Sequence, residues 1–85
     1  MKIDTRIKEL IAVGASVTAN CQPCLQYHVA KARESGAEDD EIAVAIAIAK
    51  AVRKGAATKM DDFAATQGAA ASAERNAGQG CGCAS

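Results

Sequence analysis

The run Ile42–Ala49 consists only of Ala, Ile and Val, and it is the feature that most constrains the fold of this chain. A helix that is apolar on every side must be covered on every side. The chain has 85 residues with one Phe, one Tyr and no Trp, and a domain of this size buries only about 60% of its surface. Because one small chain of a few helices cannot cover such a run, the sequence predicts a homo-oligomer.

Apolar and capping residues predict an all-α fold. Asp4 is the expected N-cap of a helix over residues 5–19, where Ile and Leu recur at helical spacing. A second helix is expected over residues 22–35. A third is expected over residues 39–66, with Asp39 as its N-cap, because the acidic side chains at its start suit the positive end of the helix dipole.

The composition changes toward the C-terminus. We predict a helical domain over residues 1–66, in which Gly55 kinks or splits the third helix, and a flexible Ala/Gly-rich tail over residues 67–85. The tail has no apolar period and ends in Cys81 and Cys83, separated by one glycine. This pair is open to three interpretations: an electron shuttle to another dithiol, a soft-metal or metalloid site, or no function.

Charge and hydropathy exclude several classes of function. Ten Lys and Arg balance ten Asp and Glu, without the basic stripe that is typical of nucleic-acid binding. No apolar stretch reaches the roughly 18 residues of a membrane span, and residues 1–6 lack the apolar core of a signal peptide. We therefore predict a cytoplasmic protein with neither nucleic acid nor membrane as a partner. In that compartment, cysteines serve catalysis or metal binding rather than structural disulfides.

Cys21 and Cys24 form a Cys-x-x-Cys motif at the expected start of the second helix. Helix positions three apart have Cβ atoms within about 6 Å, and a disulfide needs about 4 Å, so a small adjustment joins the two thiols. Pro23 suits the first turn of a helix, and His28 follows Cys24 by four residues on the same face. A helix N-terminus and a nearby imidazole each lower the pKa of a thiol, the first favouring Cys21 and the second Cys24 as the reactive sulfur.

The same side chains allow a different interpretation, half of a zinc site. Zinc commonly takes four ligands, often from two such cysteine pairs, and His28 with Cys81 and Cys83 could complete the set. Glu9, upstream of Cys21 in the first helix, is by itself a solvated charge. The residues alone leave three classes open: a redox enzyme, a thiol-based metal or metalloid carrier, and a structural oligomer with a vestigial site.

The spacing Glu9-x11-Cys21-x2-Cys24-x3-His28 resembles the alkyl hydroperoxidase D signature of the carboxymuconolactone decarboxylase-like superfamily. The segment Gly36–Ala45 resembles the turn and the next helix of that family. A lone Cys-x-x-Cys pair is weak evidence. Four residues of three chemical types at matching spacing, followed by a matching helix, are strong evidence, and they identify the chain as a member of this group.

The resemblance implies an all-helical subunit that assembles as trimers or hexamers, with a thiol peroxidase or disulfide reductase activity that needs no cofactor. In this family the second cysteine attacks the peroxide and the first resolves the sulfenic acid, which gives these roles to Cys24 and Cys21. Glu9 and His28 would form the proton relay. The implied partners are a hydroperoxide or disulfide substrate and a thiol reductant of the thioredoxin-like or dihydrolipoyl type.

Two features depart from the family pattern. Pro23 stands where some peroxidase members carry a histidine, directly before the second cysteine. Cys81 and Cys83 lie outside the pattern and are candidate auxiliary thiols. Decarboxylases of the superfamily lack the cysteine pair, so the motif favours the redox members.

Overall fold

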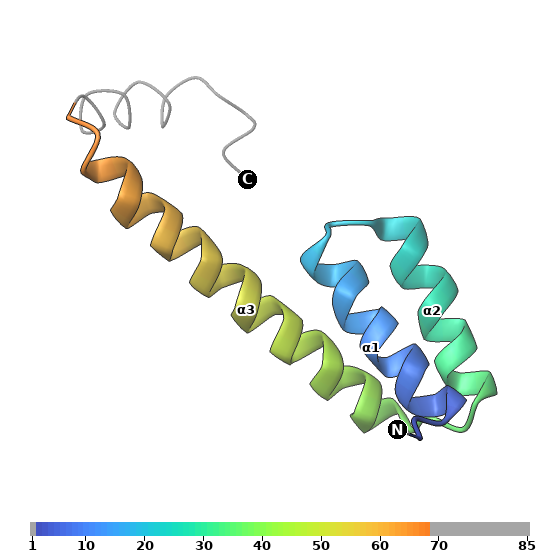
Figure 1. Ribbon diagram of the computed structural model, residues 1–85. Coiled ribbons are helices and arrows are strands. Elements are labelled where there is room, and N and C mark those ends of the chain that lie inside the picture. The colour runs from blue at the N-terminus through green and yellow to red at the C-terminus, as the bar shows by residue number, and fades with distance from the viewer. Residues whose placement is uncertain (1, 69–85) are drawn as a thin grey trace. The chain divides into compact units, whose positions relative to one another are not determined.

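The computed structural model describes residues 2–68 of the chain, and this part forms three helices, whose arrangement can be followed in Figure 1. Helix α1 spans Thr5–Thr18, α2 spans Gln22–Glu34 and α3 spans Asp39–Ala65, and the described residues contain no strand. The all-α prediction is confirmed. Helices α1 and α2 begin at the predicted residues, whereas α3 includes Asp39, its predicted N-cap, as its first residue. All three end one residue before the predicted end, a difference within the usual fraying of helix ends. None of these three helices is long and apolar enough to cross a membrane.

The chain forms two compact units, Met1–Lys54 and Gly55–Ser85, and α3 contributes to both. The helix is continuous through Gly55, so the predicted split of the third helix does not occur, although the boundary between the units falls at this glycine. In the second unit the described residues are the end of α3 and a short segment after it. The predicted tail over residues 67–85 lies outside the described residues from position 69 onward.

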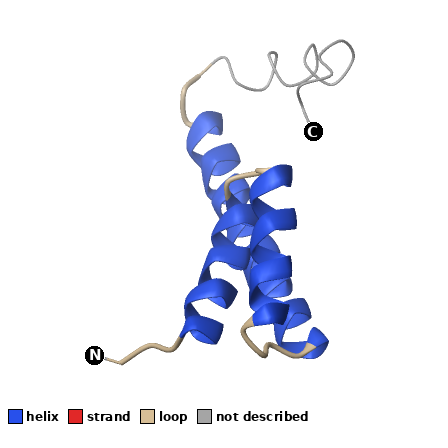
Figure 2. Ribbon diagram, turned by 90° about the vertical axis from the view of Figure 1, so that its right-hand side faces the viewer, coloured by secondary structure: helices blue, strands red, loops and turns tan. Residues whose placement is uncertain are grey.

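The core of the first unit lies between an α1–α2 hairpin and the first half of α3. Figures 1 and 2 show α1 and α2 side by side and antiparallel. The buried cluster consists of Val13, Ala32, Ala37 and Ile42. Partly buried side chains pack against it: Leu10, Leu25, Val29, Ala45 and Ile46. Val13 is the largest fully buried side chain among the described residues, so this core is small.

The N-terminal caps of α1 and α3 differ in how well the sequence predicted them. Asp4 accepts a hydrogen bond from Ile7 N–H at 2.9 Å, which confirms it as the N-cap of α1. In α3 the first helical hydrogen bond runs from Ile42 N–H to the carbonyl of Glu38. Glu38 rather than Asp39 is therefore the N-cap. Asp is the better N-cap of the two by local preference, so contacts elsewhere in the fold override that preference here.

Glu41 supplies those contacts at the start of α3. Its Oε1 accepts a hydrogen bond from Glu38 N–H at 2.9 Å, as the third helical residue does in a capping box. Its Oε2 accepts a hydrogen bond from the guanidinium of Arg6 on α1. The hydrogen bond from Glu38 and the contact with Arg6 hold the pKa of Glu41 below its usual value of 4.5. The start of α3 is thereby tied to the start of α1.

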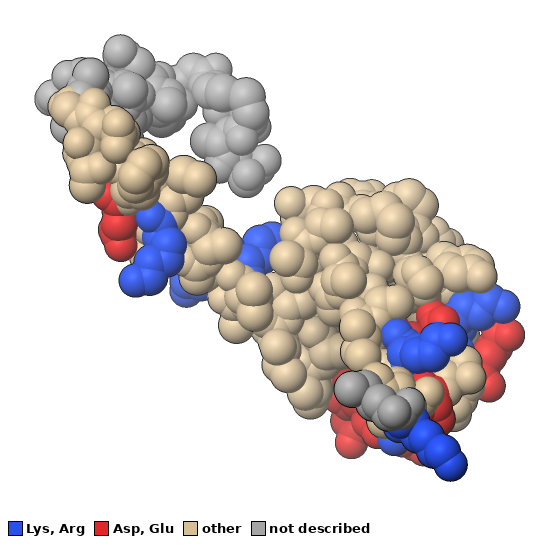
Figure 3. All heavy atoms as spheres, in the orientation of Figure 1, with Lys and Arg blue, Asp and Glu red and all other residues tan. Residues whose placement is uncertain are grey.

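One side of the apolar run in α3 is left uncovered. Ile42 and Ala49 are buried, whereas Val44 and Ile48 are 56% and 60% exposed. A groove between α1 and α3 has a lining without charged residues: Ile7, Leu10, Ile11, Gly14, Ala15, Thr18, Ala45, Ile48, Ala49 and Val52. Figure 3 shows most of the charged side chains on this face of the first unit near the end at which α1 and α3 begin, with much of the remaining face uncharged. The first unit thus presents an apolar groove that residues 2–68 leave open.

Candidate redox site

The turn between α1 and α2 places the cysteine pair. Cys21 N–H donates to the carbonyl of Ser16 and Asn20 N–H donates to that of Val17, both at 3.0 Å, which is the pattern of a Schellman motif. Asn20 holds the left-handed position of this motif, with φ 57°, where glycine is commonest and asparagine also occurs. The next residue, Cys21, both ends this turn and is the N-cap of α2.

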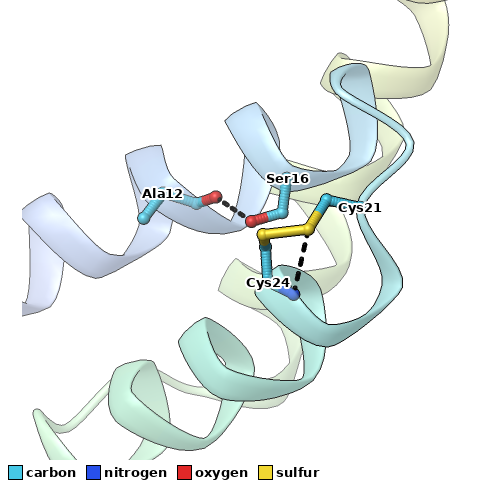
Figure 4. Close-up of a disulfide and its surroundings, with 4 residues drawn as sticks. All are labelled: Ala12, Ser16, Cys21 and Cys24. Carbon is cyan, nitrogen blue, oxygen red and sulfur yellow. Dashed lines mark hydrogen bonds between the residues drawn. A yellow bond between two sulfur atoms is a disulfide. The ribbon is translucent and has the colours of Figure 1, made fainter.

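Cys21 and Cys24 form a disulfide across the first turn of α2 (Figure 4), with 5.2 Å between their Cα atoms. Cys21 Sγ accepts a hydrogen bond from Cys24 N–H at 3.3 Å, so it occupies the position of a capping oxygen. Pro23 lies in this first turn, as the sequence predicts. Cys24 is exposed and Cys21 is half-buried. The sulfur that the helix N-terminus favours as a thiolate is therefore that of Cys21.

A histidine–carboxylate pair links α1 and α2, one turn along α2 from Cys24. His28 Nδ1 lies 2.7 Å from Glu9 Oε1, and the two side chains are 30% and 18% exposed. Because a carboxylate only accepts hydrogen bonds, Nδ1 carries the proton, and Nε2 is the atom left to take up or deliver one. The Tyr27 ring packs edge-on against the imidazole, with 5.0 Å between ring centroids.

The structure therefore pairs four of the six residues that the sequence singled out. The disulfide and the histidine–carboxylate contact each join two of them. The other two, Cys81 and Cys83, lie outside the described residues. Within residues 2–68, no three His, Cys, Asp or Glu side chains converge as metal ligands. A zinc site of the predicted kind would therefore need ligands from beyond this part of the chain.

Two further side chains near the disulfide gave no clear signal in the sequence. Ser16 is 5% exposed and donates to the carbonyl of Ala12 at 2.7 Å, and Figure 4 shows it on the side of α1 that faces the disulfide. Arg53 of α3 reaches the turn, where Nη1 donates to the carbonyl of Val17 at 3.0 Å and to Asn20 Oδ1 at 2.8 Å. A serine within an apolar helix is a weak signal. The contact between Arg53 and Asn20 joins residues 33 apart, and such a contact produces no signal in a local sequence pattern.

The protein has a helical hairpin with a Cys-x-x-Cys disulfide at the start of its second helix and a His–Glu pair one turn further on. These features define the class of all-α dithiol proteins. The chain belongs to the carboxymuconolactone decarboxylase family, whose sequence profile matches residues 1–68. The resemblance inferred from the motif spacing is thereby confirmed.

The relative that the chain matches has a name that states no activity. Over 55 residues the chain is 42% identical to a Paracoccus denitrificans protein named "Uncharacterized protein 4 in cox locus". The alignment covers 65% of this chain and 50% of that protein, so the chain spans about half the length of the curated relative it matches. No solved structure matches the chain significantly.

Proposed function

We propose that this protein is a thiol-dependent oxidoreductase of the alkyl hydroperoxidase D type, which reduces hydroperoxides or disulfides through its cysteine pair. The observation that carries the proposal is the Cys21–Cys24 disulfide at the N-terminus of α2, with the Glu9–His28 pair one helical turn away. The two sulfur atoms exchange two electrons with the substrate. The two titratable side chains move the protons that accompany them.

In the peroxidase cycle, the Cys24 thiolate attacks a peroxide oxygen, the O–O bond breaks, and the leaving oxygen takes a proton. Cys24 then carries a sulfenic acid. The Cys21 thiolate attacks the Cys24 sulfur, the S–O bond breaks, and water leaves with a second proton. The exposed Cys24 is the sulfur that a bulky peroxide reaches. The hydrogen bond from Cys24 N–H favours Cys21 as the thiolate for the second step.

His28 is the residue that we assign to proton transfer. Its Nδ1 is held by Glu9 at 2.7 Å, so exchange with the leaving oxygen falls to Nε2. Glu9 is a positioning residue: it fixes the orientation of the imidazole and stabilises the imidazolium, as the third group of a nucleophile–base–orienter set does.

We also assign the apolar groove of the first unit to a second copy of the chain. In a single chain, Ile11, Ile48 and Val52 of this groove are 57% to 60% exposed. Burial of apolar surface stabilises by about 25 cal/mol per Å², less the loss of freedom on association. A homotrimer or hexamer, the assemblies that the family resemblance implies, is the arrangement we propose.

The oxidised site must be reduced before it can act again. We place the cycle in the cytoplasm, where thiols are kept reduced. A thiol of the thioredoxin-like or dihydrolipoyl type is the reductant that we propose. Such a thiol opens the disulfide by exchange, through a mixed disulfide with one of the two cysteines.

Stopped-flow oxidation of the reduced full-length chain tests this function. The experiment uses hydrogen peroxide and cumene hydroperoxide, in a Cys81→Ser/Cys83→Ser background that removes the other thiols. We expect one equivalent of peroxide to convert each chain to a product that peptide mapping identifies as the Cys21–Cys24 disulfide. Cys24→Ser is the control and should consume peroxide no faster than free cysteine does. A reaction no faster than that of free cysteine with both peroxides would refute the peroxidase activity.

The disulfide reductase activity is measured separately. The same reduced chain is mixed with a disulfide-bonded substrate such as insulin, and release of substrate thiols is followed. Turnover in the presence of a dithiol reductant is expected to require both Cys21 and Cys24. Failure of both assays would remove the proposed function.

A further inference from the structure

A cleft opens beside the disulfide on the side of Cys21. Its volume is about 220 Å³, below the roughly 300–1,000 Å³ of sites for drug-sized ligands, so it suits a small molecule. The end of α1, the start of α2 and the middle of α3 form its lining: Ser16, Val17, Asn20, Cys21, Gln22, Leu25 and Arg53. Cys24 is not part of this lining. Of the two cysteines, a molecule in the cleft therefore contacts Cys21.

Arg53 brings a positive charge into this cleft. Its Nη1 atom donates to the carbonyl of Val17 and to Asn20 Oδ1, so one part of its role is to hold the turn. A guanidinium has five N–H donors, and three of them remain on Nε and Nη2. Among residues 2–68 no carboxylate lies within ion-pair distance of Arg53, and no acidic residue lines the cleft. The remaining donors and the charge are thus available to an anion.

We infer that this cleft binds the carboxylate of a small anionic thiol at Arg53 and so directs the thiol sulfur to Cys21. The inference rests on the proposed function, because it names the class of thiol that reduces the disulfide. Arg53 is the positioning residue, since a carboxylate fits the planar fork of a guanidinium. The apolar side chain of Leu25 and the amides of Asn20 and Gln22 complete the lining.

The exchange reaction balances in two steps. The substrate thiolate attacks Cys21 Sγ, the Cys21–Cys24 bond breaks, and Cys24 leaves as a thiolate that takes up a proton. A second thiolate then attacks the substrate sulfur of the mixed disulfide, and Cys21 leaves as a thiolate at the N-cap, where Cys24 N–H donates to it. Two thiols are oxidised to one disulfide, and the protein disulfide is reduced to a dithiol.

The test compares three small thiols that differ mainly in charge: 3-mercaptopropionate, 2-mercaptoethanol and 2-aminoethanethiol. Reduction of the Cys21–Cys24 disulfide in the oxidised full-length chain is followed by acid quench, alkylation and mass spectrometry. Each thiol is compared between wild type and variant, because this ratio cancels the thiol's own reactivity. We expect Arg53→Gln to slow 3-mercaptopropionate about three- to tenfold. It should leave 2-mercaptoethanol within about twofold and should not slow 2-aminoethanethiol.

Two further variants separate charge at the cleft from other effects. Arg53→Lys keeps the charge and should retain most of the preference for 3-mercaptopropionate. Lys54→Gln removes an exposed charge next to Arg53 in sequence, outside the cleft lining, and should leave the rates of all three thiols unchanged within about twofold.

Equal slowing of all three thiols by Arg53→Gln would overturn the inference, because Arg53 would then only hold the turn. If Lys54→Gln slowed 3-mercaptopropionate as selectively as Arg53→Gln does, the inference would also be overturned. The loss of net charge alone would then explain the effect. If wild type is reduced but Arg53→Gln slows none of the three thiols, this inference is refuted and the proposed function stands. A disulfide that none of the three thiols reduces also overturns this inference, whereas the peroxide and disulfide reductase assays decide the proposed function.

Discussion

Glu9 Oε1 and His28 Nδ1 lie 2.7 Å apart although the two residues are 19 positions apart in the chain. Glu9 belongs to α1 and His28 to α2, so the contact crosses the hairpin whose turn carries Cys21. The orientation of the imidazole therefore depends on how α1 packs against α2. A change in either residue tests proton transfer only if the hairpin itself stays folded.

We expect His28→Ala and Glu9→Gln each to slow oxidation of Cys24 at least about tenfold, since general acid–base assistance is typically worth 10²–10⁴-fold. The double variant should lose less than the sum of the two single losses in free energy, because the pair acts as one unit. Stopped-flow measures the rates, and circular dichroism checks the helices. Glu34→Gln, an exposed carboxylate on α2, is the matched control. If neither single variant changes the rate, the relay is wrong and the metal-carrier interpretation gains.

Cys21→Ser should separate the two chemical steps. Cys24 remains able to attack peroxide once, but no neighbouring thiol then resolves the sulfenic acid. Mass spectrometry after one equivalent of peroxide should find one added oxygen on Cys24, which a sulfenic-acid reagent traps. The Cys81→Ser/Cys83→Ser background prevents the tail thiols from taking over this step. Trapping of the sulfenic acid on Cys21 in a Cys24→Ser chain, at the wild-type rate, would reverse the two assignments.

The fold was largely predictable because its signals are local. Asp4 caps α1 through its own neighbour Ile7, and Gly36, with φ 94°, lies just past the end of α2. The Cys-x-x-Cys pair also bonds within one helical turn, so its spacing alone indicates the contact.

Other parts of the site could not be predicted, because packing between distant segments decides them. The Arg53–Asn20 hydrogen bond depends on where α3 passes the turn. Burial of Ser16 depends on which side of α1 faces α2 and α3. The N-cap of α3 shifted to Glu38 because Glu41 and its partner Arg6 fix that helix start. Glu9 was predictable only in part. The family spacing indicated its role, but only the fold shows its contact with His28.

The left-handed conformation of Asn20 gives a prediction about stability. Asn20→Ala and Asn20→Gly both remove the side chain that accepts from Arg53, so their difference isolates the backbone. At φ 57° a Cβ is unfavourable by roughly 1–2 kcal/mol, so Asn20→Gly should be the more stable of the two by about 1 kcal/mol. Urea unfolding measures this difference in the free energy of unfolding. Ala47→Gly, at an exposed helical position, should instead destabilise by about 1 kcal/mol. Equal stability of the two Asn20 variants would contradict the turn geometry.

Glu41 gives a prediction about pH. The N–H of Glu38 and the guanidinium of Arg6 hold its pKa below the usual 4.5, so at acidic pH the unfolded chain binds the proton more tightly than the folded one. The contribution of Glu41 to stability is therefore fully present above pH 4.5 and is lost as the pH falls through the lower, folded-state pKa. The difference in unfolding free energy between wild type and Glu41→Gln should be constant above that pH and shrink below it. Asp62→Asn, an exposed carboxylate, should show no such change. A difference that grows on acidification would contradict the assigned direction.

The open groove predicts self-association of the chain. Ile48 is 60% exposed and lines the groove between α1 and α3, so a charge placed there would be buried without a partner in any assembly that covers the groove. We expect the wild-type chain to form a trimer or hexamer at micromolar concentration, and Ile48→Glu to shift it toward monomer. Light scattering gives the mass of each. Lys50→Glu changes charge at an exposed position outside the groove lining and should leave the mass unchanged. A wild-type monomer would refute the assembly, and an Ile48→Glu chain of wild-type mass would show that the contact lies on another face.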